Sequence, residues 1–447
     1  MGADLRAIVA PGGRLGRFAR RSAAGIVLLA ALACGRAPGD SDPLSVWVMG
    51  REGELVRELV PEFERRNPGI RVRVQQVPWS AAHEKLLTAY VGESLPDIVQ
   101  VGNTWIPEFV ALGALAPLDA RIEREGLPRD DFFAGVLDAG VVGGTTWALP
   151  WYADARLFFY RTDLFAAAGV AGPPRTWAEL RESLAKVHAQ SGAGRHAILL
   201  PLTEWEPLAI FALQRGATLL RDGDRYGDFA SPAFRTAFDF YLSLFADGLA
   251  PTRGAADLAN LQQDFAAGWL ASYVSGPWQL GELRRRLPPS FESQWAAAPM
   301  PAPEASPDGA PGFSLAGGSS LGIVARSPRP DAAWKLLAYL AEPAQQSAFY
   351  ALAGDLPARR SAWRDARLAD DAKAQVFFAQ LERVRATPKV PEWERIAGRI
   401  ARHAEAAVRG EESPDEALAA LDRETDRALE KRRWMLANAG PPAESRP

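Results

Sequence analysis

The strongest constraint on the fold is an alternation of short apolar strands with amphipathic helices. Three segments have the composition and patterning of β-strands: residues 44–49, 70–74 and 97–101. Amphipathic helices are predicted after each of them, over residues 53–66, 80–92 and 105–113. Because strands that alternate with helices form a parallel sheet covered by helices, this pattern predicts an α/β fold.

The same pattern begins again at residue 157. Further strands are predicted at residues 157–160, 197–201, 269–274 and 321–325. Further helices are predicted over residues 176–190, 232–248 and 331–353, followed by a last long helix that starts after Ser413. Capping residues mark two of these helix starts, namely Thr176 with Glu179 and Ser413 with Glu416. At 447 residues, the chain fits two domains of roughly 150–200 residues better than one.

The beginning of the chain has the organisation of an export signal. A basic region precedes the uncharged, apolar residues 23–33, a stretch that is too short to span a membrane. Cys34 is the only cysteine and follows small residues, as in the bacterial lipobox, although that box prefers Leu where Ala31 stands. We therefore expect a signal peptide over residues 1–33 and a lipid-anchored tether over residues 34–43. The alternative is an ordinary cleaved signal in which Cys34 is incidental.

Charge and motifs argue against several other functions. The formal net charge of -3 argues against a nucleic-acid surface, which usually carries a basic excess. The four histidines lack the spacing of metal ligands, and no phosphate-binding loop motif is present. We expect no metal, no cofactor and no nucleic-acid partner.

Eight segments, in the same order along the chain, resemble the extracellular solute-binding proteins of ATP-binding-cassette sugar importers. That group includes maltose- and trehalose-binding lipoproteins. The segments are ELVPEFERRNPGIRVRV, SLPDIVQVGNTWIPEFVALGALAPLD, WALPWYADARLFFYRTDLFAAAGV, TWAEL, SGPWQL, GGSSLGIVA, GDLPARRSAW and SPDEAL. They are spread over nearly all of the chain that follows the export signal.

The resemblance implies a two-lobed periplasmic-binding-protein fold of type II, with a ligand cleft between lobes joined by crossing strands. Lobe 1 would comprise residues 44–152 and 321–356, and lobe 2 residues 153–320 and 357–447. The implied function is extracytoplasmic binding of a di- or oligosaccharide and its delivery to the importer permease by cleft closure. The implied protein is a monomer held at the cell envelope by its lipid, and it is not an enzyme.

Sugar binding calls for acids and amides, which bond hydroxyl groups, and for aromatic rings, which cover C–H faces. In the resembled family, the segment before the strand at 157–160 lines the cleft, and an acid four residues after the crossover proline binds the sugar. Here that acid is Asp154, with Tyr152 beside it, although Asp154 could instead cap a helix or loop. Trp151 and Tyr152 should face opposite sides of an extended segment. Arg156 is interpreted as a surface or hinge salt bridge.

The resemblance supplies the remaining candidates. Trp278 occupies the position of a stacking ring, and the segment at Gly317, Gly318 and Ser319 would let the backbone approach the sugar. Many relatives carry a tryptophan where Ser319 stands, so one stacking surface is missing. The other candidates are Glu204, Trp205, Asn103, Trp105 and Trp393. For Trp278 and Trp105 the alternative is a ring that belongs to the core.

The sequence gives weaker support to an enzyme than to a binding protein. Residues 318–322 fit the G-x-S-x-G motif of serine hydrolases, but that motif needs a strand before it and a helix after it. Here a loop precedes the motif and a strand-like segment follows it. A glycosidase needs only two carboxylates and stays open as an alternative, as does a carbohydrate sensor of the same fold that feeds no transporter.

Overall fold

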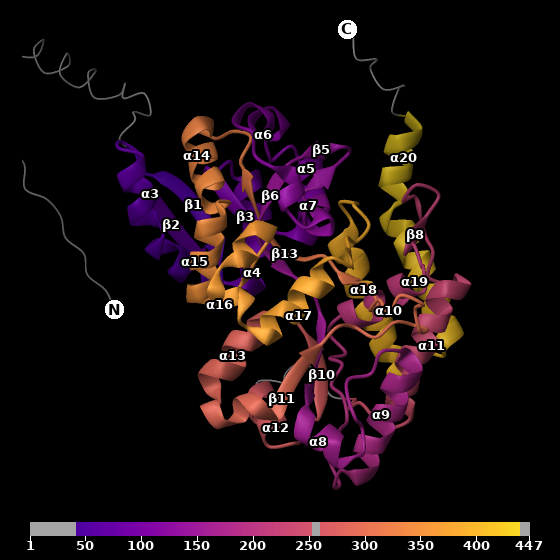
Figure 1. Ribbon diagram of the computed structural model, residues 1–447. Coiled ribbons are helices and arrows are strands. Elements are labelled where there is room, and N and C mark those ends of the chain that lie inside the picture. The colour runs from indigo at the N-terminus through magenta and orange to yellow at the C-terminus, as the bar shows by residue number, and fades with distance from the viewer. Residues whose placement is uncertain (1–41, 253–259, 439–447) are drawn as a thin grey trace, which may run out of the picture. The chain divides into compact units, whose positions relative to one another are not determined.

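The computed structural model describes residues 42–252 and 260–438. The predicted signal peptide, Cys34 and nearly all of the predicted tether lie outside the described residues. The chain divides into two units, Met1–Asp42 and Pro43–Pro447, and the second holds every helix and strand that is described. The following paragraphs describe that second unit (Figure 1).

A six-stranded sheet, the first sheet, has the strand order β14-β6-β13-β3-β1-β2. Its strands are β1 (Leu44–Met49), β2 (Val72–Val77), β3 (Ile98–Gly102), β6 (Ala148–Asp154), β13 (Gly317–Ile323) and β14 (Leu356–Pro357). The expected parallel pairing is confirmed for β1 with β2 and with β3. The later strand β13 pairs antiparallel with both β3 and β6, an arrangement that the alternation of strands and helices does not predict. The sheet is therefore mixed, because β13 enters it from a distant part of the chain and in the opposite direction.

The helices of the first half and two later ones pack around this sheet. They are α2 (Glu52–Leu55), α3 (Val60–Arg66), α4 (Trp79–Val91), α5 (Ile106–Ala111), α6 (Asp119–Glu125), α7 (Ala134–Ala139), α14 (Pro330–Leu340) and α15 (Pro343–Ala353). The helix predicted over 53–66 is interrupted by a 3-10 turn at Val56–Glu58. Pro61 opens α3, and since proline has no amide hydrogen it cannot continue the preceding helix.

A second, three-stranded antiparallel sheet has the order β10-β7-β11. Its strands are β7 (Leu157–Arg161), β10 (Ser272–Ser275) and β11 (Trp295–Ala298). Three further two-stranded pairs are β4 (Val141–Val142) with β5 (Thr145–Thr146), β8 (Leu220–Arg221) with β9 (Tyr226–Gly227), and β12 (Ser314–Leu315) with β15 (Val384–Arg385). The strand predicted at 197–201 is reduced to isolated bridges, one of which joins Leu199 to Tyr273.

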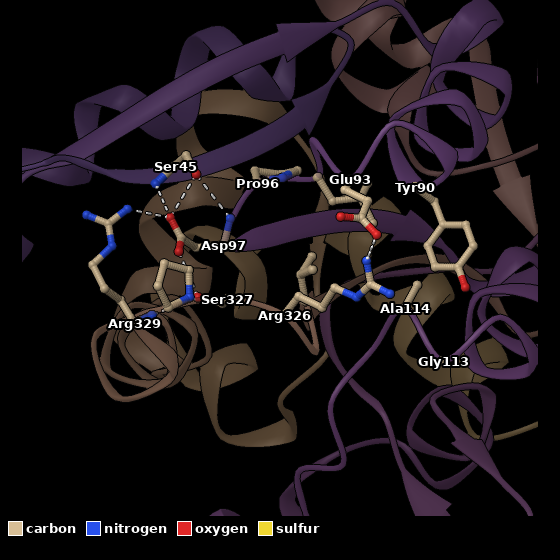
Figure 2. Close-up of a pocket in the computed structure, with 13 residues that line it drawn as sticks. Ser45, Tyr90, Glu93, Pro96, Asp97, Gly113, Ala114, Arg326, Ser327 and Arg329 are labelled. Atoms are coloured by element: carbon tan, nitrogen blue, oxygen red, sulfur yellow. Dashed lines mark hydrogen bonds and ion pairs between the residues drawn. The ribbon is translucent and has the colours of Figure 1, made fainter. Parts of the chain in front are cut away.

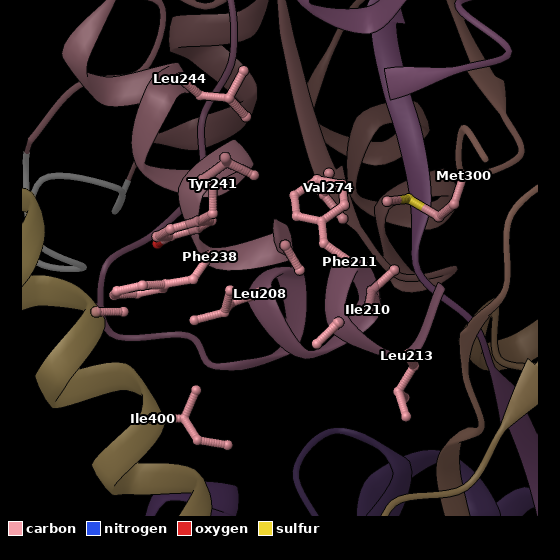
Figure 3. Close-up of a cluster of buried hydrophobic side chains, with 14 of the residues drawn as sticks. Leu208, Ile210, Phe211, Leu213, Phe238, Tyr241, Leu244, Val274, Met300 and Ile400 are labelled. Atoms are coloured by element: carbon pink, nitrogen blue, oxygen red, sulfur yellow. The ribbon is translucent and has the colours of Figure 1, made fainter. Parts of the chain in front are cut away.

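The helices of the second half are α8 (Thr162–Ala167), α9 (Trp177–Gln190), α10 (Glu206–Gln214), α11 (Pro232–Ala246), α12 (Leu261–Ala266), α13 (Trp278–Arg286), α16 (Ala366–Ala369), α17 (Ala372–Leu381), α18 (Trp393–Val408), α19 (Pro414–Ala428) and α20 (Glu430–Asn438). Both predicted helix starts are confirmed, because the Thr176 and Ser413 hydroxyls accept from the amides of Glu179 and Glu416. Figure 3 shows part of the core these helices share, with Phe211 of α10, Tyr241 of α11 and Ile400 of α18 among its buried side chains.

The two sheets are joined by a very short crossing. β6 of the first sheet ends at Asp154, β7 of the second begins at Leu157, and only Ala155 and Arg156 lie between them. All of β6 is buried, yet its Tyr152 and Asp154 line a cavity, whereas Trp151 packs into a core. Trp151 stacks on Phe349, with ring centroids 4.4 Å apart, and its ring also lies 5.7 Å from that of Tyr152. The regular alternation expected for these two residues is interrupted, because the pairing of β6 with β13 shifts register at this point.

Candidate functional site

A cavity of about 650 Å³ lies where the ends of β6 and β13 meet helices α10, α13 and α18; we call it the central pocket. It brings together eight of the residues predicted from the sequence: Asn103, Trp105, Tyr152, Asp154, Trp205, Trp278, Gly317 and Gly318. They come from segments far apart in the chain. The central pocket is therefore a product of the tertiary fold.

The other three predicted residues do not line the central pocket. Ser319 is fully buried and donates its hydroxyl hydrogen to the carbonyl of Val101, 2.9 Å away. Trp393 is also fully buried and packs edge-on against Trp205, at 5.4 Å between ring centroids. Glu204 is partly buried beside the pocket residues, without lining the cavity. In this structure Trp393 supports a pocket ring and is not one itself.

Two glycines of β13 let that strand lie against the acid of β6. Gly317 pairs with Asp154 and Gly318 with Ala153. A Cβ at Gly317 would lie 2.8 Å from the Oδ2 of Asp154, and one at Gly318, where φ is +100°, would clash with the carbonyl of Tyr152. These glycines were expected to admit a ligand, and the contacts give a further reason for them in the packing of the sheet.

Asp154 forms one end of a charged cluster with Arg156 and Glu206. Nη1 of Arg156 lies 3.2 Å from Oδ2 of Asp154, and its Nη2 lies 3.0 Å from Oε1 of Glu206. The Arg156 side chain is only 14% exposed, so its ion pairs are confirmed but a surface location is wrong. The guanidinium also lies 4.6 Å from the centroid of the Trp278 ring. One arginine therefore holds an acid from β6, an acid from α10 and a ring from α13.

The remaining oxygen of Asp154 has no partner. Its Oδ1 is buried and makes no hydrogen bond within the described part of the chain. Burial raises the pKa of Asp154, the charge of Arg156 opposes the shift, and Glu206 adds to it. An unpaired buried carboxylate oxygen costs free energy until it accepts a hydrogen bond. A ligand hydroxyl group would supply that bond.

A second acidic group lies at the end of β1. Oε1 of Glu52 accepts from the Tyr152 hydroxyl at 3.0 Å and from the Trp79 indole at 3.2 Å. Burial raises the pKa of Glu52, and these hydrogen bonds oppose it. Asp355, just before β14, also lines the pocket, and burial followed by the charges of Glu52 and Asp154 raises its pKa well above the usual range. These carboxyl groups favour a ligand rich in hydrogen-bond donors.

Indole rings form much of the remaining wall of the central pocket. Trp79 and Trp105 meet edge to face with ring centroids 5.7 Å apart, and Trp205 and Trp278 contribute from helix starts on α10 and α13. Asn103 does not offer a free amide, because its Nδ2 donates to Gly317 and its Oδ1 accepts from Ser320. Asn103 therefore fixes β13 beside the cavity.

Sequence reasoning missed several pocket residues. They are Arg51, Glu52, Trp79, Arg156, Glu206, Asp355, Thr387 and Glu394, among others. Two signals could have found some of them. Arg51 and Glu52 follow the carboxyl end of a strand, where α/β proteins bind ligands, and Asp355 lies inside the GDLP segment already recognised.

A smaller cavity of about 260 Å³ lies at the other end of β1 (Figure 2). Its buried acid, Asp97, accepts from the amide and hydroxyl of Ser45, from the Ser327 hydroxyl at 2.7 Å and from Arg329 at 2.7 Å. Although burial opposes it, this set of hydrogen bonds lowers the pKa of Asp97. Because its oxygens are engaged by the protein itself, Asp97 ties β1 and β3 to the segment after β13.

The site gives little support to a serine-hydrolase reaction or to metal binding. The G-x-S-x-G segment lies almost wholly inside β13, and the Ser320 hydroxyl donates to Asn103, so no nucleophile turn is formed there. In residues 42–252 and 260–438, no cluster of three or more potential metal ligands occurs. Within the same residues, no helix has the length and apolar character needed to cross a membrane.

Comparisons with known proteins agree on one family. Residues 49–347 match the family described as bacterial extracellular solute-binding protein. The sugar-binding protein MalE from the phytopathogen Xanthomonas citri is a similar solved structure, 46% identical with a TM-score of 0.84, and the match covers 89% of this chain and 100% of that one. A putative binding protein of Brucella abortus is 27% identical, over 85% of this chain and 91% of the relative. The diacetylchitobiose binding protein DasA of Streptomyces coelicolor is 26% identical, over 79% and 81%.

Proposed function

Because the chain belongs to the bacterial extracellular solute-binding protein family, we propose that it captures a di- or oligosaccharide and delivers it to the permease of an ATP-binding-cassette importer. Membership of this family implies a location outside the cytoplasm. The members and neighbours with which it aligns are solute-binding proteins and not enzymes.

The fold is the two-lobed α/β fold of those sugar-binding proteins. We assign residues 44–152 and 321–356 to lobe 1 and residues 153–320 and 357–447 to lobe 2. These boundaries fall within β6, β13 and β14, which are neighbours in the first sheet. The three strands are then the crossing strands, and a rotation of one lobe against the other would bend the chain at their ends.

The observation that carries the sugar assignment is the pairing of a buried, unpartnered oxygen on Asp154 with an indole ring on Trp278 in one cavity. A pyranose ring presents hydroxyl groups at its edge and C–H groups on its faces, so it needs an acceptor and a flat apolar surface together. Glu52 and Asp355 add acceptors, and Trp79, Trp105 and Trp205 add rings. The volume of about 650 Å³ suits a ligand larger than a single sugar ring.

Contacts from both lobes explain how a bound sugar would favour the closed form of the protein. Glu52 and Trp105 belong to lobe 1, whereas Trp205, Glu206 and Trp278 belong to lobe 2. A sugar that touches both sets makes all of its contacts only when the lobes are close together. Its binding therefore shifts the equilibrium towards the closed form, which the permease would recognise.

We also propose that residues 1–33 are removed as a signal peptide and that Cys34 carries a lipid. The support for this is the basic and apolar pattern before Cys34 together with the extracytoplasmic family. Residues 34–43, rich in Gly, Pro, Ser and Asp, would form the tether. Mass spectrometry of the membrane fraction tests this, because a lipidated cysteine adds the mass of its acyl chains and Cys34→Ser would release the protein.

A thermal-shift screen against mono- and disaccharides tests the proposed function. A ligand that binds only the native state must raise the melting temperature, by a stabilisation of about 4 kcal/mol at a thousandfold excess over Kd. At least one sugar should give such a shift. No shift from any sugar would contradict the proposal. Prolonged incubation should also return each sugar intact, whereas the release of new reducing ends would indicate a glycosidase.

A further inference from the structure

A third hollow lies between α18 and α19. These two helices pack against each other in the second half of the chain (Figure 1). This groove has a volume of about 600 Å³ and shares no lining residue with the central pocket. Helix α18 contributes Arg395, Gly398, Arg399 and Arg402, and α19 contributes Glu424 and Arg427. We call it the arginine groove.

The arginine groove has a large excess of positive charge. Four guanidinium groups line it against a single carboxylate, in a chain whose formal net charge is -3. Glu424 is bonded by Arg402 and lies 3.2 Å from Nε of Arg399. Arg395 and Arg427 form no ion pair or side-chain hydrogen bond with any described residue, so the charge of two guanidiniums is left without a counter-ion.

The guanidiniums are close enough to repel one another. The pKa of Arg399 is lowered first by its burial and then by the charges of Arg395, Arg402 and Arg427, while Glu424 opposes the shift. Arginine groups gathered in this way gain free energy when an anion enters between them. A bound anion would therefore relieve the repulsion between these guanidinium groups.

The floor of the groove is open at Gly398. Residues 395, 399 and 402 are three and four positions apart, so they share one face of α18, and Gly398 lies between them. A Cβ at Gly398 would meet no atom within 4 Å. A small residue at this position leaves room between the guanidiniums, and a side chain introduced there would start in open space.

We propose that the arginine groove binds a phosphate-bearing anion. A phosphate group presents several anionic oxygens that match the planar fork of arginine, and groups of arginines are the usual protein partner of phosphate. Phosphate could come from a soluble ligand or from a phospholipid headgroup, and the two sources share the chemistry that the groove recognises. This inference does not depend on the sugar site, because the two sites have no residue in common.

Binding to the purified full chain is measured with two probes. Inorganic pyrophosphate is titrated by calorimetry, and sedimentation is used with vesicles of phosphatidylcholine that contain phosphatidylglycerol. The variants are Gly398→Phe, which fills the groove without changing charge, and Arg427→Gln. The matched control is Arg423→Gln, which removes an exposed arginine from the same helix α19 but outside the groove. A cooperative urea-unfolding transition like that of the wild type reports that each variant is folded.

We expect at least one probe to bind the wild type, and Gly398→Phe and Arg427→Gln to weaken that binding about fivefold or more, with Arg423→Gln close to wild type. Binding of pyrophosphate assigns the groove to soluble phosphates, and binding of vesicles alone assigns it to headgroups. The proposal is overturned if neither probe binds, or if Gly398→Phe binds as tightly as the wild type. It is also overturned if the control loses as much affinity as Arg427→Gln, since general surface charge would then explain the binding.

Discussion

The guanidinium of Arg156 lies 4.6 Å from the centroid of the Trp278 ring while its Nη1 bonds Asp154. A single residue in the two-residue crossing between the sheets therefore positions the two side chains on which the proposed sugar site depends most. The cation lies over the indole ring, and Trp278 is still 39% exposed, so part of the ring is accessible to a ligand.

Asp154→Asn should weaken sugar binding about 10- to 100-fold, because a hydrogen bond to a charged acceptor contributes about 1.5–3 kcal/mol. The amide keeps the shape of the side chain, so the fold should be retained. Isothermal titration calorimetry with the sugar found by thermal shift provides the measurement. Asp331→Asn, on an acid that is 84% exposed, is the matched control and should bind normally. Unchanged affinity in Asp154→Asn would remove this residue from the site.

Trp278→Ala should weaken binding and abolish a large part of any sugar-induced change in tryptophan fluorescence. The reason is that the stacked face of an indole changes its surroundings when a sugar covers it. Trp434→Ala is the control, since this ring on α20 is 67% exposed and remote in sequence from every pocket segment. If the fluorescence response of Trp278→Ala equals that of the wild type, another ring of the pocket carries the stacking.

Arg156→Gln should destabilise the protein by about 3–5 kcal/mol, because it leaves the buried Asp154 and the partly buried Glu206 without their cation. Adding Asp154→Asn removes one of the uncompensated charges and should restore part of the stability. Urea unfolding of the single and double variants measures both effects. A single variant as stable as the wild type, or a double variant no better than the single, would show that the ion pairs do not stabilise the fold.

Glu204 should make the protein less stable as pH rises from about 4.5 to about 7. Burial raises its pKa from 4.5 to about 7 against the attraction of Arg156, and Glu206 and Asp154 add to the shift. In that window the folded protein holds a proton that the unfolded chain has lost, so the free energy of unfolding falls with rising pH and then levels off.

Glu204→Gln has no carboxyl group at this position to hold the proton. Between the two ends of the window, its free energy of unfolding in urea should therefore fall less than that of the wild type, by up to about 3 kcal/mol. Some slope of the same sign should remain, because burial also raises the pKa of Asp154 and Asp355. Identical slopes in the wild type and the variant would contradict the assignment to Glu204.

Much of the fold could be predicted from local pattern. Apolar runs and caps located β1, β3 and β7 and the starts of α9 and α19, since these signals depend on neighbours in the sequence. The direction of β13 could not be predicted, because it is set by which distant strands it joins. The strand expected at 197–201 forms only isolated bridges, which a run of apolar residues does not distinguish from a full ladder.

Site residues could be predicted where the resemblance supplied a motif. They could not be predicted where the rotational position of a residue on its helix determines whether the side chain faces the pocket. Trp393 was chosen, but the next residue, Glu394, faces the pocket, because successive helical positions point about 100° apart. Glu204 precedes α10, whereas Glu206 is the first residue of that helix and lines the pocket. Glu52 and Asp355 come together through the contact of α2 with α15, two helices from distant parts of the chain, which no local pattern encodes.

A crystal structure of the protein with the sugar that gives the largest thermal shift tests the central claim most directly. We predict carbohydrate density in the central pocket, with a hydroxyl group within hydrogen-bond distance of the Oδ1 of Asp154 and a sugar face against the ring of Trp278. Density for the sugar at another place, with this pocket filled by water alone, would contradict the account.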